Sequence, residues 1–190
     1  MHDIKGYLKT YLNKPLDEYI MSSFQTYYET LVEYNAHTNL TSIVEPLDVV
    51  IKHFYDSVWY MDMIKLFSES PKVLDVGSGA GFPGVPLKLI NKEIELHVLD
   101  SVKKKTTFLE YLKQALNIKY TVHNERAETH LVTHQNTYDI ITFRAVGTMD
   151  ELLKLCLPML KVGGIIVALK SLHVEEELQN IQKYINNKLK

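Results

Sequence analysis

Glycines gather in one ten-residue stretch of this chain, Asp75-Val76-Gly77-Ser78-Gly79-Ala80-Gly81-Phe82-Pro83-Gly84. The stretch follows a short apolar run and precedes a segment with helical periodicity. Glycines at such a strand-to-helix junction adopt positive φ angles and let the backbone pass close to a ligand. The unpaired N–H groups at the start of the following helix favour an anionic group. The stretch therefore predicts a cofactor-binding loop.

Two cofactor classes fit this loop. Residues 79–84 match the dinucleotide pattern G-x-G-x-x-G, and residues 77–81 match the shorter G-x-G-x-G of S-adenosylmethionine enzymes. In the dinucleotide pattern the first glycine follows the strand closely, which would be Gly77, and a glycine is then required where Phe82 stands. Asp75, two residues before Gly77, is typical of S-adenosylmethionine loops. The pattern favours S-adenosylmethionine, with a dinucleotide or a purely structural turn as alternatives.

An acidic residue ends the next predicted strand. Asp100 lies 19 residues after Gly81, a position from which a carboxylate accepts hydrogen bonds from two ribose hydroxyls. This role serves S-adenosylmethionine and NAD equally, so Asp100 predicts a ribosyl cofactor without choosing one. The alternative role for Asp100 is to cap the following helix.

The order of the predicted elements indicates an α/β fold. Residues 1–70 have helical periodicity and form a helical N-terminal cap, and residues 71–190 form an α/β domain that makes one compact unit with it. Strands are expected at 73–76, 95–100, 119–123, 138–143 and 165–170, and helices at 85–91, 106–116, 127–131, 149–160 and 175–189. A turn is expected at 162–164. Strands that alternate with helices predict a parallel sheet of about five strands.

Composition excludes several classes of protein. The 190 residues include 21 Lys and Arg against 23 Asp and Glu, 46% hydrophobic residues and one cysteine. The hydrophobic content argues against disorder, and the single Cys156 excludes a disulfide framework and a thiolate metal cluster. The longest purely apolar run, 165–169, is too short to span a membrane. We expect a cytoplasmic chain without membrane association, and near-neutral charge argues against coating nucleic acid by charge alone.

Six segments together carry a more specific resemblance. They are 39–41 (Asn-Leu-Thr), 52–57 (Lys-His-Phe-Tyr-Asp-Ser), 77–84, 99–101 (Leu-Asp-Ser), 125–128 (Glu-Arg-Ala-Glu) and 143–146 (Phe-Arg-Ala-Val). With them the chain resembles, from about residue 20 to about 178, the bacterial small-subunit rRNA guanine-N7 methyltransferase family, also called glucose-inhibited division protein B. The resemblance implies a Rossmann-like class I fold with S-adenosylmethionine as the cofactor.

The resemblance also implies roles for individual residues. The implied cofactor-binding residues are Gly77, Gly79, Gly81, Phe82, Asp100, Ala127, Glu128 and Arg144. Asp100 would hold the ribose, Ala127 and Glu128 would lie beside the adenine, and Arg144 would face the cofactor and the target base. The alternative for Arg144 is a salt bridge that closes the end of the sheet.

The implied base pocket includes His53, Asp56 and Ser57. The alternatives are a purely structural His53 and an ion pair between Asp56 and Lys52, four residues earlier. No metal ion is expected in the site. Guanine N7 carries a free lone pair and no proton, so the implied transfer needs no general base.

The implied reaction is methyl transfer from S-adenosylmethionine to N7 of a guanine in 16S rRNA of the small ribosomal subunit, by a monomer that does not act on DNA. Alternatives are an inactive cofactor-binding relative that associates with the ribosome, a methyltransferase of another substrate, and an NAD-dependent oxidoreductase. Members of the family continue into a sixth and a seventh strand. Here the sequence ends one predicted helix after the fifth strand, so we expect the last two strands to be missing.

Overall fold

The N-terminal segment is helical, as its periodicity predicts. The computed structural model describes residues 3–12, 15–59, 61–144 and 148–169. The helices of this segment are α1 (Ile4–Tyr11), α2 (Glu18–Thr38), α3 (Pro46–Val49), a π-helix η1 (Val50–Tyr55), α4 (Asp56–Trp59) and α5 (Met61–Phe67). The side chain of Asp17 caps α2 by accepting from the N–H of Ile20 at 2.7 Å, and Pro46 opens α3 at its first turn.

A parallel sheet follows, with helices between its strands. Its elements are β1 (Lys72–Val76), α6 (Gly84–Ile90), β2 (Glu95–Leu99), α7 (Lys103–Ala115), β3 (Thr121–His123), α8 (Ala127–Thr133), β4 (Tyr138–Arg144), α9 (Met149–Cys156), a 3-10 helix η2 (Leu157–Met159) and β5 (Leu160–Leu169). The strand order is β3-β2-β1-β4-β5, and every neighbouring pair is parallel. The predicted α/β class and five strands are confirmed, whereas the predicted helix at 175–189 lies outside the described residues.

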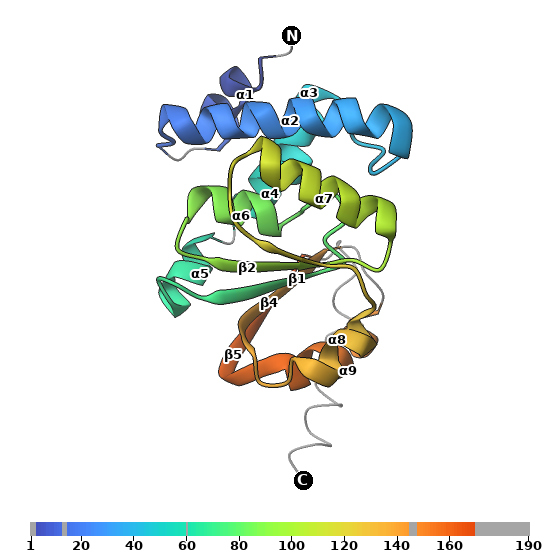
Figure 1. Ribbon diagram of the computed structural model, residues 1–190. Coiled ribbons are helices and arrows are strands. Elements are labelled where there is room, and N and C mark those ends of the chain that lie inside the picture. Colours follow the sequence, from blue (N-terminus) through green and yellow to red (C-terminus); the bar gives the residue numbers. More distant parts are fainter. Residues whose placement is uncertain (1–2, 13–14, 60, 145–147, 170–190) are drawn as a thin grey trace.

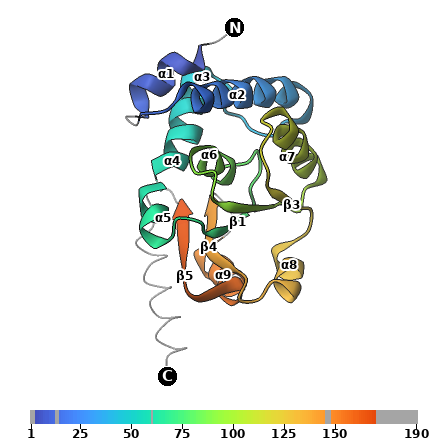
Figure 2. The same ribbon diagram turned by 60° about the vertical axis from the view of Figure 1, so that its left-hand side comes forward.

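The sheet is covered on both faces (Figure 1). Helices α6 and α7 lie on one face beneath α2, and α8 and α9 lie on the other, an arrangement that Figure 2 shows from a second side. Side chains of β1 alternate accordingly: Val73 joins the core on the α6 side and Leu74 the core on the α9 side. In the part of the chain described, no helix is long and apolar enough to cross a membrane.

The segment from Pro46 to Trp59 is helical, but it contains the π-helix η1 where the apolar periodicity predicts a uniform α-helix. Phe54 in this segment is fully buried. A π-turn inserts an extra residue into a helix and shifts the side chains that follow, and such turns are frequent at functional sites. His53 and Phe54 both lie within this turn.

Three predicted boundaries are wrong by three residues or more, and one of them is the end of α9, predicted at 160 and observed at Cys156. Residues 162–164 do not form a turn between helix and strand but belong to β5, whose pairing shifts from Tyr138↔Leu160 to Ile140↔Ile165. Glycines absorb this irregularity, because Gly163 has a φ of 83° and a Cβ on Gly164 would lie 2.9 Å from the carbonyl oxygen of Asp139. Helix α7 begins at Lys103, three residues earlier than predicted.

Candidate functional site

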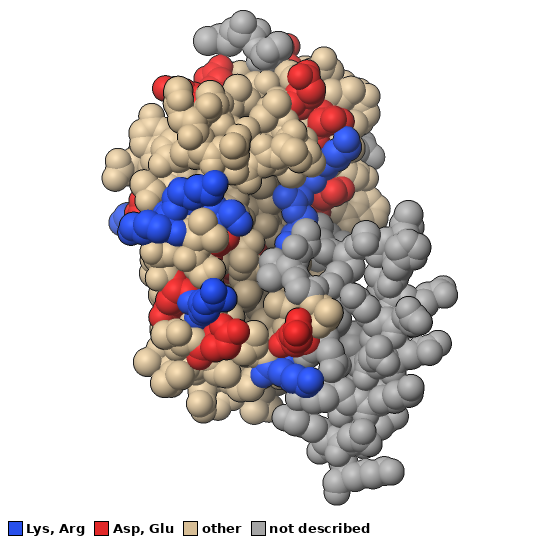
Figure 3. Space-filling view, turned by 90° about the vertical axis from the view of Figure 1, so that its right-hand side faces the viewer, with Lys and Arg blue, Asp and Glu red and all other residues tan. Residues whose placement is uncertain are grey.

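A cavity of about 590 Å³ lies at the carboxyl ends of β1, β2 and β4. This is the edge of a parallel sheet at which ligands bind in doubly wound folds. Figure 3 looks toward this end of the molecule and shows Lys and Arg side chains on both sides of a hollow. The cavity is lined by Leu40, Thr41, His53, Val76, Gly77, Ser78, Gly79, Ala80, Phe82, Leu99, Asp100, Ser101, Val102, Lys105, Glu125, Arg126, Ala127, Glu128, Arg144, Leu152 and Leu155.

The glycine loop forms one wall of this cavity. Gly77, Gly79 and Gly81 have φ angles of 68°, 59° and 99°, so all three use backbone conformations that favour glycine. Asp75, fully buried beneath the loop, accepts hydrogen bonds from the hydroxyl of Ser78 at 2.6 Å and the N–H of Gly84 at 3.0 Å. Burial raises the pKa of Asp75 to about 6. Asp75 therefore braces the loop from below and does not line the cavity.

Asp100 clamps the loop from the neighbouring strand. Its Oδ2 accepts from the N–H of Gly79 at 3.0 Å, and its Oδ1 accepts from the N–H of Val102 at 2.9 Å. The ammonium of Lys105 lies 3.6 Å from Oδ2. Each carboxylate oxygen has further lone pairs, and Asp100 borders the cavity, so the same side chain can accept from ligand hydroxyls.

A column of stacked side chains forms the wall opposite Asp100. The ring of His53 stacks on that of Phe82 with centroids 4.3 Å apart, and the guanidinium carbon of Arg144 lies 5.2 Å from the Phe82 centroid. Arg144 donates to the carbonyl of Lys52 at 2.7 Å and to Nδ1 of His53 at 2.8 Å. Nδ1 of His53 also lies 3.1 Å from the carbonyl oxygen of Lys52, so this nitrogen faces a donor and an acceptor, and Nε2 lies 3.3 Å from the Thr41 hydroxyl.

This wall holds His53 in its neutral form. Burial, and next the charge of Arg144, lower the pKa of His53 to about 4. A neutral His53 with both ring nitrogens engaged orients Arg144 and does not serve as a proton acceptor. Its place in the fold is therefore that of a positioning residue.

Most of the residues singled out in the sequence meet at this cavity. Those that line it are His53, Gly77, Gly79, Phe82, Asp100, Ala127, Glu128 and Arg144. Gly81 does not, because it is buried against Tyr27 and Val85. Ser57 is fully buried and donates to the carbonyl of His53, and Asp56 also lies outside the lining.

Two further outcomes concern charged and polar partners. Lys52 pairs with Asp48 at 3.0 Å, so the proposed ion pair with Asp56 is absent from the described contacts. Thr41 belongs to the lining but received no role from the sequence. The sequence signal that could have identified Thr41 is the segment Asn39-Leu40-Thr41. In the structure the N–H groups of Leu40 and Thr41 donate hydrogen bonds to Oδ1 of Asn35, which fixes the backbone of this segment.

Acidification should destabilise the protein through His53. Its lowered pKa means that the unfolded chain binds a proton between pH 6.5 and about 4 that the folded chain does not bind, so stability falls as pH falls through this window. Between about pH 7 and about pH 4.5 the wild type should lose about 2 kcal/mol more than His53→Gln, since glutamine donates and accepts without titrating. Urea unfolding at both pH values measures the difference, and equal losses would contradict the assignment.

The helical cap holds the loop through one hydroxyl. Tyr27 of α2 donates to the carbonyl of Ala80 at 2.6 Å, and its ring stacks on that of Phe82 with centroids 5.1 Å apart. Tyr27→Phe should cost about 1–2 kcal/mol of stability and weaken cofactor binding several-fold, because a buried carbonyl loses its donor. Tyr28→Phe is the matched control: its hydroxyl donates to Val44 at 3.2 Å and does not reach the loop. Urea unfolding and cofactor titration of both variants separate the two effects, and equal affinities would exclude the coupling.

Comparison with known proteins agrees with this architecture. Residues 20–189 match the family described as rRNA small subunit methyltransferase G. The ribosomal RNA small subunit methyltransferase G of Oenococcus oeni is 44% identical over 173 residues, which cover 89% of this chain and 71% of that relative. The protein of the same name from Bacillus licheniformis is 40% identical over 176 residues, covering 90% of this chain and 72% of that relative.

A solved structure supports the fold independently. The SAM-dependent O-methyltransferase of Thermotoga maritima superposes with a TM-score of 0.59 at 17% identity, covering 80% of this chain and 55% of that one. At this identity the likeness shows the fold alone, which is the Rossmann-like fold of class I methyltransferases. The resemblance drawn from the six sequence segments is thus confirmed, and this chain belongs to the rRNA small subunit methyltransferase G family.

Proposed function

We propose that this chain transfers the methyl group of S-adenosylmethionine to N7 of a guanine in 16S rRNA of the small ribosomal subunit. The main support for the proposal is the cavity of this chain, which belongs to the methyltransferase family. The glycine loop at Gly77 and Gly79 bounds this cavity on one side, and Asp100 on the neighbouring strand bounds it on another. The proposal includes action as a monomer, in the cytoplasm, on the assembled subunit.

The residues present fit this cofactor. A Cβ built on Gly79 would meet only the carbonyl oxygen of Gly77, at 3.9 Å, so the space above the loop is open to a ligand. Asp100 offers the carboxylate that ribose hydroxyls require, and Ala127 and Glu128 line the wall on which we place the adenine. Gly81 supports the loop from within the core rather than by touching the cofactor.

The proposed reaction mainly requires that the methyl donor and the guanine be positioned against each other. When bound, S-adenosylmethionine supplies an activated methyl group on a sulfonium, and guanine N7 offers a lone pair without a proton. The chain therefore has to align two reactants at near-attack distance and exclude water. Arg144 and His53, held by each other and by Phe82, form a rigid wall against which the base is placed. The neutral, fully engaged His53 agrees with a reaction that needs no general base.

Asp56 and Ser57 have supporting parts in this proposal. Ser57 donates to the carbonyl of His53 and so holds the residue that orients Arg144. Asp56 follows the π-turn, and burial raises its pKa from the ordinary value. We place neither side chain in contact with the base.

The test is methyl transfer from labelled S-adenosylmethionine to small ribosomal subunits that lack this modification. We expect incorporation at N7 of a single guanine and none on unrelated RNA. Incorporation at another atom, or on another class of substrate, would replace the proposed acceptor. A folded chain that binds the cofactor without transfer would be an inactive relative, and NAD binding without competition by S-adenosylmethionine would indicate an oxidoreductase.

A further inference from the structure

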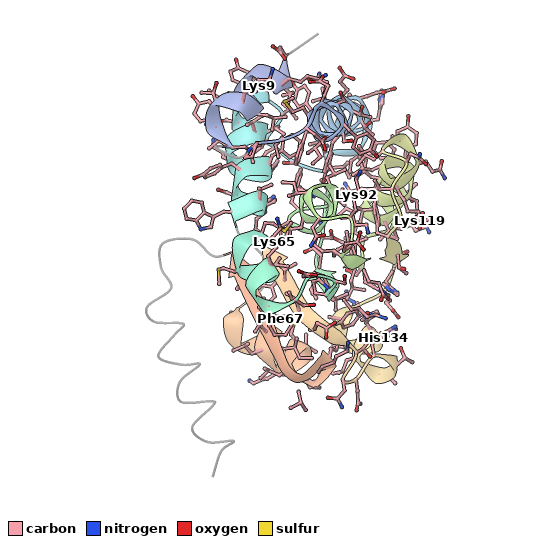
Figure 4. The ribbon with its side chains drawn as sticks, turned by 90° about the vertical axis from the view of Figure 1, so that its left-hand side faces the viewer. Lys9, Lys65, Phe67, Lys92, Lys119 and His134 are labelled. Carbon is pink, nitrogen blue, oxygen red and sulfur yellow. The ribbon has the colours of Figure 1, made fainter. Side chains whose placement is uncertain are left out.

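A second cluster of chemically active side chains lies outside the cofactor cavity. His123 ends β3, His130 lies on α8, and His134 is the residue that caps the C-terminus of α8. One ring nitrogen of each lies within 4.8 Å of a ring nitrogen of both others. Figure 4 shows the labelled His134 at the end of α8, across the molecule from Lys65 and Phe67 of α5. Spacing by four residues on a helix brings two side chains to one face.

Hydrogen bonds determine which nitrogen of His123 carries a proton. Nε2 of His97 lies 3.2 Å from Glu95 Oε1, and Nδ1 of His97 lies 2.9 Å from Nε2 of His123. Since a carboxylate only accepts, His97 donates to Glu95 and its Nδ1 is the acceptor for the proton on His123 Nε2. His123 is left with a lone pair on Nδ1, and that atom lies 3.9 Å from Oε1 of Glu125. Two acceptors thus face each other with no proton between them.

His130 and His134 complete the cluster. His130 is fully buried, with Nδ1 2.8 Å from Glu125 Oε1 and Nε2 2.7 Å from the hydroxyl of Tyr138. The ring of His134 stacks on that of His130 with centroids 3.8 Å apart. The hydrogen bonds described for His134 involve its Nδ1 alone, at the Thr133 hydroxyl and the His130 carbonyl, so its Nε2 is left to accept.

We propose that His123, His130 and His134 bind one divalent transition-metal ion of the zinc class. Imidazole ligands suit such ions, and three histidines with one water molecule make up a tetrahedral set. Zinc–nitrogen bonds of about 2.0–2.1 Å place ligand nitrogens about 3.3 Å apart, so the ring nitrogens have to approach by up to about 1.5 Å. Because the rings of His130 and His134 are stacked with 9° between their planes, one of these rings also has to rotate to direct its lone pair at the ion. A cation also removes the conflict between the His123 lone pair and Glu125.

The protons of the cluster permit this exchange. Metal at Nδ1 of His130 requires the proton of that nitrogen to move to Nε2, which then donates to the hydroxyl of Tyr138, so the ring stays neutral. Cys156, the last residue of α9, is fully buried in the apolar core and does not belong to this set.

The cluster adjoins the cofactor site through one residue. Glu125 lines the cavity and also contacts His130, and the loop after it continues directly into Arg126, Ala127 and Glu128 of the cavity wall. A bound ion would tie the end of β3 to α8 and so fix this wall. The inference does not depend on the proposed reaction, because metal binding is measured without cofactor or RNA.

The test is titration of the full chain, freed of metal by chelator, with ZnCl2 in a calorimeter and with CoCl2 followed by visible absorption. We expect one equivalent of each ion and the intense cobalt bands of a four-coordinate site. His134→Gln, at a partly exposed position, should weaken zinc binding at least about 100-fold, since even the loss of an outer-shell partner costs 10–100-fold. His37→Gln, an exposed histidine on α2, is the matched control and should bind as the wild type does.

The outcomes of these titrations either support or overturn the proposed metal site. Saturable binding that His134→Gln and His123→Gln both weaken, with circular dichroism unchanged, supports the site. Absence of saturable zinc binding by the folded wild type overturns it, as does equal binding by wild type and His134→Gln. Binding that His37→Gln weakens as much as His134→Gln would move the ion to the surface and also overturn the proposal.

Discussion

Replacing Gly79 with leucine is expected to lower the affinity for S-adenosylmethionine by at least about 100-fold, or about 2.7 kcal/mol, in a chain that remains folded. Gly79 lines the cavity, and a side chain grown from it meets open space rather than protein. The leucine would therefore occupy the volume in which we place the cofactor. Calorimetric titration with S-adenosylmethionine measures the loss.

Gly163→Leu is the matched control for this change. Gly163 also has a positive φ, 83° against 59° for Gly79. A Cβ built on Gly163 has nothing within 4 Å, and one built on Gly79 meets only a carbonyl oxygen at 3.9 Å. A side chain at a positive φ should cost each variant about 1–2 kcal/mol in backbone strain, so the unfolding free energies of the two variants should fall by similar amounts. Only Gly79 borders the cavity. Unchanged affinity in Gly79→Leu would show that the cofactor does not lie above this loop.

Replacing Arg144 with alanine is expected to lower kcat/KM for methyl transfer at least about 100-fold, because misplacing a reactant by about 1 Å has this effect. Arg144 fixes the ring of His53 and lies over Phe82, so its removal loosens the whole wall opposite Asp100. Arg144→Lys keeps a charge but loses the planar fork that reaches Lys52 and His53 together, and it should recover little activity.

The measurement compares transfer kinetics, cofactor affinity and thermal unfolding of both variants. Loss of the hydrogen bonds made by the Arg144 guanidinium should also lower the free energy of unfolding by about 1.5–3 kcal/mol. This is less than the total free energy of unfolding of a typical domain, so the variants should remain folded. Full activity in Arg144→Lys would mean that charge alone is needed. A loss of stability without any loss of transfer at a temperature where both variants are folded would make Arg144 a purely structural closure of the sheet.

The sheet and the glycine loop were predictable because their signals are local. Asp75 and Gly84 lie nine residues apart, and the glycines between them stand at the positions where φ is positive. The alternation of short strand-like segments of four to six residues with helical segments is likewise a short-range pattern, and it located all five strands. Their parallel direction followed from the rule that strands joined by helical crossovers run the same way, whereas their register was not predicted.

Other features depend on contacts far apart in the chain. The bulge in β5 exists because Gly164 passes close to the carbonyl of Asp139, and nothing near residue 164 indicates this. Arg144 reaches His53 across 91 residues, so this contact could not be predicted from the neighbours of either residue in the sequence. The histidine cluster joins the end of β3 to α8 and the residue after it, and we did not group these histidines from the sequence because none of them belongs to a cysteine-type metal pattern.

The position of α2 has a consequence for synthesis of the protein. Its apolar stripe, which includes Phe24, Tyr27 and Leu31, packs partly against Phe54 of η1 and partly against α6 and α7, and the last residue of α7 follows the end of α2 by almost 80 residues. At about 5–20 residues per second, the part that α6 and α7 cover remains without these helices for about 4–15 seconds. During that interval this part is exposed apolar surface. We expect nascent chains stalled before residue 103 to be bound by chaperones, and chains extended well past residue 115 to be released.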